Sequence, residues 1–230
     1  MRYYLLSSLV DYTKMELHNE YRWFEDLFKH LHFPCHALLV ASSPDEIEKT
    51  RRYAQEIVDV MEKYGLSLSG FDILDRNSAC RTKELVDKAD MIIAMGGHVP
   101  TQNSFFQEID LKKHLQDFSG VWISSSAGSM NSASLVYAQP ELEGEVIDPA
   151  YQRFVPGLGI TEKMILPHYS SWKNEVVDSF RLLEDVTYPD SQGHTFYLME
   201  DGSYVLGDTE EKIEEVVGEY YILRDGVIVQ

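Results

Sequence analysis

Short apolar segments alternate with longer amphipathic segments through the first 137 residues, and this alternation limits the chain to few architectures. The apolar segments are residues 2–8, 37–41, 68–74, 90–95 and 120–124. Between them lie segments with helical character, over residues 16–31, 44–64, 82–88, 101–117 and 127–137. Strands that are apolar on both faces and alternate with helices indicate a parallel sheet covered on both sides. The sequence therefore predicts an α/β fold.

The pattern changes after residue 137. Residues 139–154 are irregular and acidic, residues 164–166 predict a short strand, and residues 174–183 predict a helix. Two antiparallel hairpins with Asp-Gly turns are then expected, one over 195–207 and one over 220–229. No linker rich in Pro, Gly or Ser interrupts the chain, so we expect one α/β hydrolytic domain over residues 1–230.

The helix expected over residues 44–64 has clear signals at both ends. Ser43 is a suitable N-cap, Pro44 suits the first helical position, and Glu46 follows three residues after the cap. Gly65 is expected to end the helix.

Composition excludes several classes of function. The 230 residues carry a net charge of −18, which argues against nucleic acid and against anionic membranes as partners. Cys35 and Cys80 lie far apart without metal-binding spacing, and they are expected to be free thiols in a reducing compartment. No apolar stretch is long enough for a signal peptide or a membrane span. We expect a cytoplasmic protein.

The strongest local signal lies at residues 121–129, where a buried strand stops at small residues and a helix begins. This is the sequence shape of a nucleophile elbow, G-x-S-x-G. In such a turn the residues two before and two after the nucleophile face each other closely. Ser126 fits because these residues are Ser124 and Gly128, whereas the two preceding serines would place a bulky Ile or Trp there. The alternative is a serine-rich helix cap.

Two turns can supply donors for a developing oxyanion. The elbow would direct the N–H of Ala127 at the reacting centre, next to the positive end of the following helix. The strand before it ends in Gly96-Gly97, where the missing side chains allow close approach of a substrate. The alternative for Gly96-Gly97 is a plain tight turn.

A serine nucleophile needs a general base, and His168 is the preferred candidate among eight histidines. It follows a short apolar strand and Pro167, so we expect it at the carboxyl end of that strand. His98 is the competitor, but it follows the Gly-Gly turn and is expected to line the pocket.

The acidic third member of a triad is not fixed by any local motif. The irregular acidic loop between Ser126 and His168 offers several residues that could orient the imidazole, namely Glu141, Glu143, Glu145 and Asp148.

Three motifs in order, Gly96-Gly97, Ser124-Ser125-Ser126-Ala127-Gly128 and Pro167-His168-Tyr169, resemble the peptidase E (aspartyl dipeptidase) family. That family belongs to the class I glutamine amidotransferase-like superfamily and includes cyanophycinase. The resemblance covers roughly residues 8–183. Glutamine amidotransferases use cysteine in the elbow, so Ser126 argues against ammonia transfer.

The resemblance implies a flavodoxin-like, three-layer sandwich that needs no metal and no cofactor. It makes Ser126 the nucleophile, His168 the base, and the N–H groups of Gly97 and Ala127 the oxyanion donors. The family's acidic member lies about fifteen residues past the nucleophile, which places it on Glu141. The best-known members cleave dipeptides that begin with aspartate.

The sequence departs from the family pattern at positions that affect the pocket. Ser124 replaces a glycine of the elbow, and His98 follows Gly97 where the family has Asn-Thr. His98 is therefore a candidate substrate-binding residue. An anionic substrate would need a cation, for which Arg181 is the first candidate, ahead of Lys173 and Arg153.

These observations lead to one preferred function and two alternatives. The preferred function is a serine peptidase or amidase that hydrolyses a small peptide through a Ser-His-acid triad and an acyl-enzyme. The first alternative is a non-catalytic binding protein on the same fold, in which His168 would turn away and lack an acidic partner. The second is a cyanophycinase-like peptidase, which would need an open cleft. Homodimerisation is expected on base rates alone.

Overall fold

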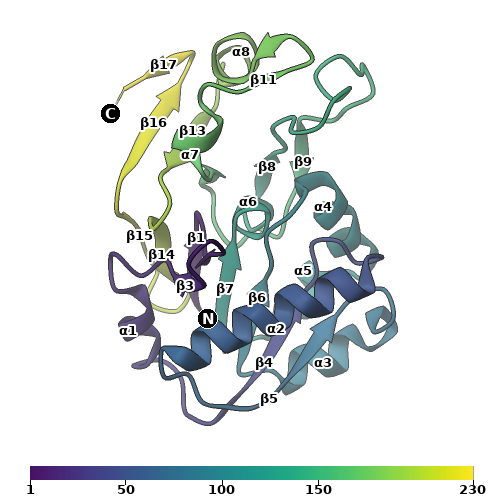
Figure 1. The fold of residues 1–230 in the computed structure, drawn as a ribbon, viewed down its shortest axis with the longest axis vertical. Helices are drawn as coiled ribbons and strands as arrows, with labels where there is room; N and C mark the ends of the chain where they lie inside the picture. The colour runs from purple at the N-terminus through teal and green to yellow at the C-terminus, as the bar shows by residue number, and fades with distance from the viewer. Residues whose placement is uncertain (230) are drawn as a thin grey trace.

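A seven-stranded, mostly parallel sheet forms the centre of the molecule (Figure 1). The computed structural model describes residues 1–229. In spatial order the strands of this sheet are β15 (Ile213–Val217), β14 (Tyr204–Asp208), β1 (Arg2–Leu6), β7 (Val121–Ser125), β6 (Met91–Ala94), β4 (Cys35–Val40) and β5 (Leu68–Leu74). From β1 to β5 the strands are parallel, and β14 and β15 continue the sheet antiparallel. The predicted α/β class is confirmed.

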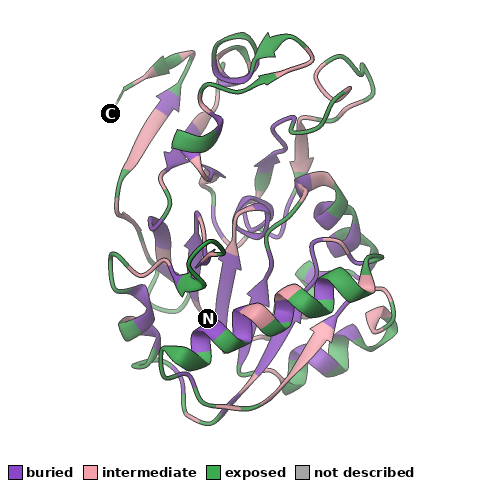
Figure 2. Cartoon of the chain, viewed as in Figure 1, coloured by how far each residue is buried: buried purple, intermediate pink, exposed green. Residues whose placement is uncertain are grey.

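Helices cover both faces of this sheet and give three layers. On one face lie α1 (Trp23–Leu27) and α2 (Ile47–Lys63). On the other lie α3 (Thr82–Lys88), α4 (Val99–Glu108) and α5 (Leu111–His114). Strand β1 shows why both faces are apolar: Tyr4 packs on the α2 side and Tyr3 on the opposite side. Figure 2 shows buried strands between helices whose outer sides are exposed.

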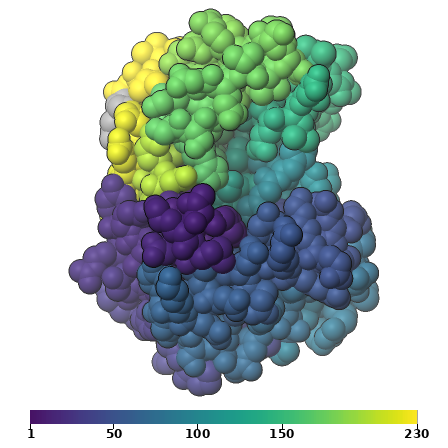
Figure 3. Space-filling model, in the orientation of Figure 1, coloured from purple at the N-terminus to yellow at the C-terminus, as the bar shows by residue number. Residues whose placement is uncertain are grey.

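A second, smaller sheet is formed by residues from the last third of the chain. Its strands, in spatial order, are β10 (Met164–Leu166), β13 (Thr195–Met199), β16 (Tyr220–Arg224) and β17 (Val227–Ile228). Helix α6 (Ala127–Asn131) packs with β10 and with its own apolar cluster, which includes Phe196 and Leu198 of β13. Figure 3 shows these later residues, in green and yellow, at one end of the molecule, with the surface recessed where they meet the earlier residues.

The remaining elements are short. Three two-stranded ladders are formed by β2 (Val10–Asp11) with β3 (Glu16–Leu17), β8 (Leu135–Tyr137) with β9 (Phe154–Pro156), and β11 (Val176–Val177) with β12 (Phe180–Arg181). The other helical segments are the 3-10 turn η1 (Ala79–Arg81), α7 (Tyr169–Trp172), the π-helical segment η2 (Leu182–Thr187) and α8 (Tyr188–Asp190). None of the helices within residues 1–229 has the length and apolarity to cross a bilayer.

The helix expected over residues 16–31 is wrong except for its centre. Residues 16–17 pair with β2, and only Trp23–Leu27 is helical. Local hydrogen bonds interrupt the helix: the Asn19 side chain accepts the N–H of Phe24, and the Trp23 indole donates to the carbonyl of His18. Side-chain bonds of this kind compete with helix formation.

Three other expected helices differ from the structure at their ends. Asp110 adopts φ 51° and divides the segment 101–117 between α4 and α5. Residues 135–137 pair with β9 instead of extending α6. Helix α2 begins at Ile47 and not at Pro44, because the carbonyl of Ser43 first accepts a turn bond from Glu46.

The helix expected over residues 174–183 is absent from the structure of this segment. Asp178 and Ser179 both adopt positive φ and make a tight turn between β11 and β12. The Asp178 carboxylate accepts the N–H groups of Gly144 and Val146, which fixes this turn against the acidic loop.

The prediction of a hairpin over residues 195–207 is wrong, because its two strands do not pair with each other. β13 joins the small sheet, whereas β14 pairs with β1 in the large sheet. The second hairpin, β16 with β17, is confirmed. Residues 200–203 are therefore the crossing between two sheets and not a simple turn, and this crossing lies beside the carboxyl end of β1.

Candidate active site

Ser126 occupies the sharp turn between β7 and α6. Its backbone has φ 52° and ψ −116°, a combination that is unfavourable for a residue with a side chain. Its N–H donates to the carbonyl of Leu6 at 3.1 Å, which fixes the turn to β1. A Cβ atom at Gly128 would lie 2.5 Å from the carbonyl oxygen of Ala94, so the turn needs glycine there. The strain in the turn is held by the packing of β6 and β1 around it.

His168 lies at the carboxyl end of β10 and faces Ser126. Its Nε2 is 2.9 Å from Oγ of Ser126, so the two residues predicted to act together are within hydrogen-bond distance. His168 adopts a left-handed backbone conformation (φ 58°), which turns the chain from β10 into α7.

Asp201 is the acidic partner of His168. Its Oδ1 is 2.6 Å from Nδ1 of the imidazole. Partial burial acts to raise the pKa of Asp201, but the hydrogen bond and charge of His168, together with the hydrogen bond from Ser7, lower it below its ordinary value. An ionised carboxylate can only accept, so Nδ1 carries the proton. Nε2 is then free to accept the proton of the Ser126 hydroxyl.

Ser7 connects Asp201 to the backbone of His168. It follows β1 and is fully buried. Its hydroxyl accepts the N–H of His168 at 2.9 Å and lies 2.9 Å from Oδ1 of Asp201, to which it donates. The carbonyl of Met199 is farther away, at 3.3 Å. Ser7 therefore fixes the position of the carboxylate relative to the histidine.

Glu141, the acidic residue expected beside His168, does not bond the imidazole. Its N–H donates to the side chain of Glu145, and Asp201 occupies the position at Nδ1. Removal from bulk water and the neighbouring Glu145 raise the pKa of Glu141 to about 7, although its side chain keeps contact with solvent. Asp201 was not predicted as a candidate because residues 200–203 contain an Asp-Gly sequence that is typical of a hairpin turn.

The N–H groups of Gly97 and Ala127 both lie in turns next to Ser126. Neither has a hydrogen-bond acceptor among residues 1–229. Gly96 lies against the nucleophile turn, since a Cβ there would be 3.1 Å from Cβ of Ser126. The Ser42 hydroxyl donates to the carbonyl of Gly96 at 2.6 Å. Because C=O and N–H of a trans peptide point in opposite directions, this bond directs the N–H of Gly97 away from Ser42.

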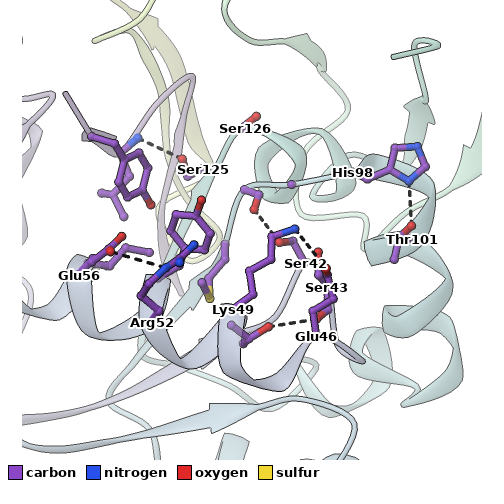
Figure 4. Close-up of a pocket in the computed structure, with 18 of the residues that line it drawn as sticks. Ser42, Ser43, Glu46, Lys49, Arg52, Glu56, His98, Thr101, Ser125 and Ser126 are labelled. Atoms are coloured by element: carbon purple, nitrogen blue, oxygen red, sulfur yellow. Dashed lines mark hydrogen bonds and ion pairs between the residues drawn. The ribbon is translucent and has the colours of Figure 1, made fainter. Parts of the chain in front are cut away.

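A cleft of about 1090 Å³ opens next to Ser126 (Figure 4). His98 lines it, as expected, and is held there by Oγ1 of Thr101 at Nδ1 and by Oε1 of Glu145 at Nε2, each at 2.8 Å. The cleft runs over the turns that follow β4, β6 and β7 and then along α2. Ligands of parallel sheets bind at such strand ends.

The expected cation Arg181 is not part of the cleft. Its guanidinium forms a two-contact ion pair with Asp185 on its own segment. Arg153 pairs with Asp190, and Lys173 lies over the ring of Tyr169 and lines a separate hollow that also touches His168. The cations that do line the cleft are Lys49 and Arg52 of α2, whose role sequence reasoning missed because they sit on an ordinary amphipathic helix.

No cluster of three His, Cys, Asp or Glu side chains within residues 1–229 is arranged to hold a metal ion. Cys35 is buried and Cys80 exposed, and both are free thiols.

Comparison with known proteins gives one family match and a match to a solved structure. The sequence profile of peptidase family S51 matches residues 25–214, a span that contains Ser126, His168 and Asp201. No functionally curated protein matches the chain. Among solved structures, the chain is similar to the crystal structure of a candidate peptidase E protein from Listeria monocytogenes EGD-e. The TM-score is 0.61 at 14% sequence identity, over 94% of this chain and 98% of that one. At this identity the likeness concerns the fold.

Proposed function

Because this chain belongs to peptidase family S51 and is a serine peptidase, we propose that Ser126, His168 and Asp201 are its catalytic triad and that it hydrolyses small peptides. The observation that carries the proposal is the continuous series of hydrogen bonds from Oγ of Ser126 through the imidazole to Asp201. A non-catalytic relative was expected to have His168 turned away without an acidic partner. The observed contacts favour the enzyme.

The geometry supports acyl transfer. Nε2 of His168 accepts the hydroxyl proton as Oγ of Ser126 attacks the peptide carbonyl. The imidazolium then donates that proton to the leaving amine, and the acyl group remains on Ser126 as an ester. A water molecule, deprotonated by the same Nε2, attacks the ester; the acid is released as the bond to Oγ breaks, and the imidazolium returns its proton to Oγ of Ser126. Asp201 holds the Nδ1–H tautomer and stabilises the imidazolium in both steps.

The N–H groups of Gly97 and Ala127 are suited to bind the oxyanion of both tetrahedral intermediates. Gly97 follows Gly96, which lies against Ser126, and Ala127 is the first residue of α6, whose N-terminal amides lack acceptors within the helix. Preorganised donors of this kind contribute roughly 10²–10³-fold in rate each.

The substrate is proposed to be a peptide that enters the cleft beside His98. Cleavage of dipeptides with N-terminal aspartate, as in the best-known members of the family, would need a cation for the aspartyl side chain. Lys49 and Arg52 are the residues available for that role in the cleft. Arg181 is not available to bind the aspartyl side chain, because its guanidinium pairs with Asp185.

Labelling with a fluorophosphonate probe tests the proposal. We expect the probe to modify the peptide that contains Ser126, as read by mass spectrometry, and we expect Ser126→Ala to abolish the modification. His168→Ala should lower the labelling rate by at least about 10³-fold, because the serine loses its base. Folded wild-type protein that is not labelled, or is labelled at another residue, would contradict the assignment.

A further inference from the structure

The cleft is longer than a dipeptide requires. Its floor follows α2 from Glu46 to Ile57, which at 1.5 Å per residue is about 16 Å. An extended peptide rises about 3.3–3.6 Å per residue, so this length matches about five residues. The volume, about 1090 Å³, lies at the upper limit for sites that hold small molecules, roughly 300–1,000 Å³.

Apolar side chains gather along this cleft. Tyr12, Met15 and Leu142 all line it and are exposed, at 47%, 37% and 54% respectively. The rings of Tyr12 and Tyr53 pack edge to face, with their centroids 5.5 Å apart, and form an aromatic surface on one side of the cleft. An exposed apolar surface with a polar rim is typical of a binding site.

The charges of the cleft pair with one another. Nζ of Lys49 lies 2.7 Å from Glu46, and Nε of Arg52 lies 3.9 Å from Glu56. Asp45 pairs outside the cleft, with Arg76 at 2.7 Å. Glu46 and Glu56 thus offset part of the positive charge that Lys49 and Arg52 present to an acidic side chain of a substrate. Selectivity for aspartate therefore has little support in this surface.

The loop that carries Leu142 is held beside the cleft by hydrogen bonds within the protein. Leu142 belongs to the loop after β8, and its N–H donates to Oε2 of Glu145 at 2.9 Å. The other oxygen of Glu145 contacts His98, next to the oxyanion turn. The backbone of Leu142 is thus held beside the cleft, which lowers the entropy lost on binding.

We propose that the cleft binds an oligopeptide of about five residues and places an apolar or aromatic side chain against Tyr12, Tyr53 and Leu142. This proposal rests on the proposed function, because it assumes that the peptide reaches Ser126. It names a substrate class that differs from acidic dipeptides in length and in charge.

Peptides of two to six residues test it. One series carries a single Phe at each position in turn, and a second carries Asp instead. We expect kcat/KM to rise at least about tenfold from the dipeptide to the best pentapeptide, and Phe to exceed Asp by a similar factor, because burial of an aromatic ring is worth that much. Equal values for dipeptides and pentapeptides, or a preference for Asp, would overturn the proposal.

Two variants locate the effect. Leu142→Ala should lower kcat/KM for the best Phe pentapeptide about tenfold. Ile147→Ala is the matched control, since Ile147 lies in the same loop, is 64% exposed and does not line the cleft. An equal loss in both variants, or no loss in Leu142→Ala, would contradict the assignment.

Binding to the Ser126→Ala protein separates this inference from the proposed function. Its affinity for the Phe pentapeptide should exceed its affinity for a Phe dipeptide and for the matching Asp pentapeptide. If the wild-type protein is not labelled and cleaves no peptide, the proposed function is wrong. The binding result would still show whether the cleft binds an apolar pentapeptide. Absence of pentapeptide binding overturns the cleft proposal even when Ser126 is labelled.

Discussion

At the scale of single residues, two carboxylates are candidates for orienting His168, namely Asp201 and Glu141. Asp201 bonds Nδ1 directly at 2.6 Å, whereas Glu141 influences the imidazole through its charge. Their substitution by amides separates the roles, because each amide keeps the shape of the carboxyl group and removes the charge.

We expect Asp201→Asn to lower kcat by about 10²–10⁴-fold, since an amide stabilises the wrong tautomer of the imidazole. Glu141→Gln, the matched control, should lower it less than about tenfold. The measurement is the rate of fluorophosphonate labelling, or of hydrolysis of a peptide once one is known. A larger loss in Glu141→Gln would assign the acidic role to Glu141 instead.

Ser7 is predicted to be a positioning residue. Ser7→Ala removes the bond to Asp201 and leaves the partly buried N–H of His168 without its acceptor, which costs about 1 kcal/mol. We expect the labelling rate to fall about tenfold and the midpoint of the pH–rate profile to move. Ser7→Thr, which keeps the hydroxyl, should restore the profile. A lower Tm with an unchanged pH profile would mean that Ser7 only supports the fold.

Single residues of the site could be predicted from the sequence where the signal is local. Ser126 and His168 each follow a recognisable strand, and small neighbours mark the first of them. Asp201 and Ser7 carry no such mark, because their roles arise from the crossing between two sheets. Asp201 lies in an Asp-Gly sequence that is typical of a hairpin, and only the pairing of β14 with β1 brings it to the site.

At the scale of elements, α1 is attached to β1 by a cluster around Asp26. Arg2 contacts the carboxylate at 2.7 Å and the hydroxyl of Tyr4 donates to it at 2.8 Å. Partial burial acts to raise the pKa of Asp26, but these hydrogen bonds outweigh it and lower the pKa to about 2. The helix is only five residues long and depends on such contacts.

The depressed pKa predicts how stability depends on pH. A group whose pKa is lower in the folded state stabilises the fold above its unfolded value, about 3.9, and loses that contribution as the pH falls toward 2. We expect Asp26→Asn to reduce the free energy of unfolding by about 2 kcal/mol at pH 7. Urea unfolding from pH 7 to 2 should show the gap to wild type closing below pH 4. Asp59→Asn, an exposed position on α2, is the control. A gap that persists at pH 2 would contradict the electrostatic explanation.

Elements with strong periodicity were predictable, and those shaped by tertiary contacts were not. β5 and α3 match their expected bounds because apolar spacing and flanking residues agree. The segment 174–183 has helical spacing but folds as a turn, since Asp178 gains two backbone hydrogen bonds from a distant loop. Such gains outweigh intrinsic propensity.

At the scale of the whole molecule, Glu214 connects the two sheets. It lies on β15 of the large sheet, and its carboxylate receives hydrogen bonds from Tyr3 of β1 and from Thr161 and Lys163, which lead into β10 of the small sheet. Burial acts to raise the pKa of Glu214, and these three bonds lower it. The carboxylate is thus expected to be ionised at neutral pH.

Glu214→Gln should destabilise the protein by about 1–3 kcal/mol, because Lys163 loses its counter-charge while still partly buried. For a chain of this size that corresponds to a decrease in Tm of roughly 2–4 °C for each kcal/mol. Glu215→Gln, the neighbouring and exposed position on the same strand, should leave the Tm within about 1 °C, since surface changes are usually within ±0.5 kcal/mol. Differential scanning calorimetry provides the comparison. Equal Tm values for the two variants would show that the sheets are held together elsewhere.

The pairing of β1 with β14 also determines when the proposed triad can assemble during synthesis of the chain. Ser7 and Asp201, which meet at the site, are separated by 194 positions in the chain. A growing polypeptide therefore carries Ser126 through much of translation without the residue that orients its base. In the proposed triad, full activity requires that β14 pairs with β1, so a nascent or truncated chain without this pairing should hydrolyse peptides far more slowly than the folded protein.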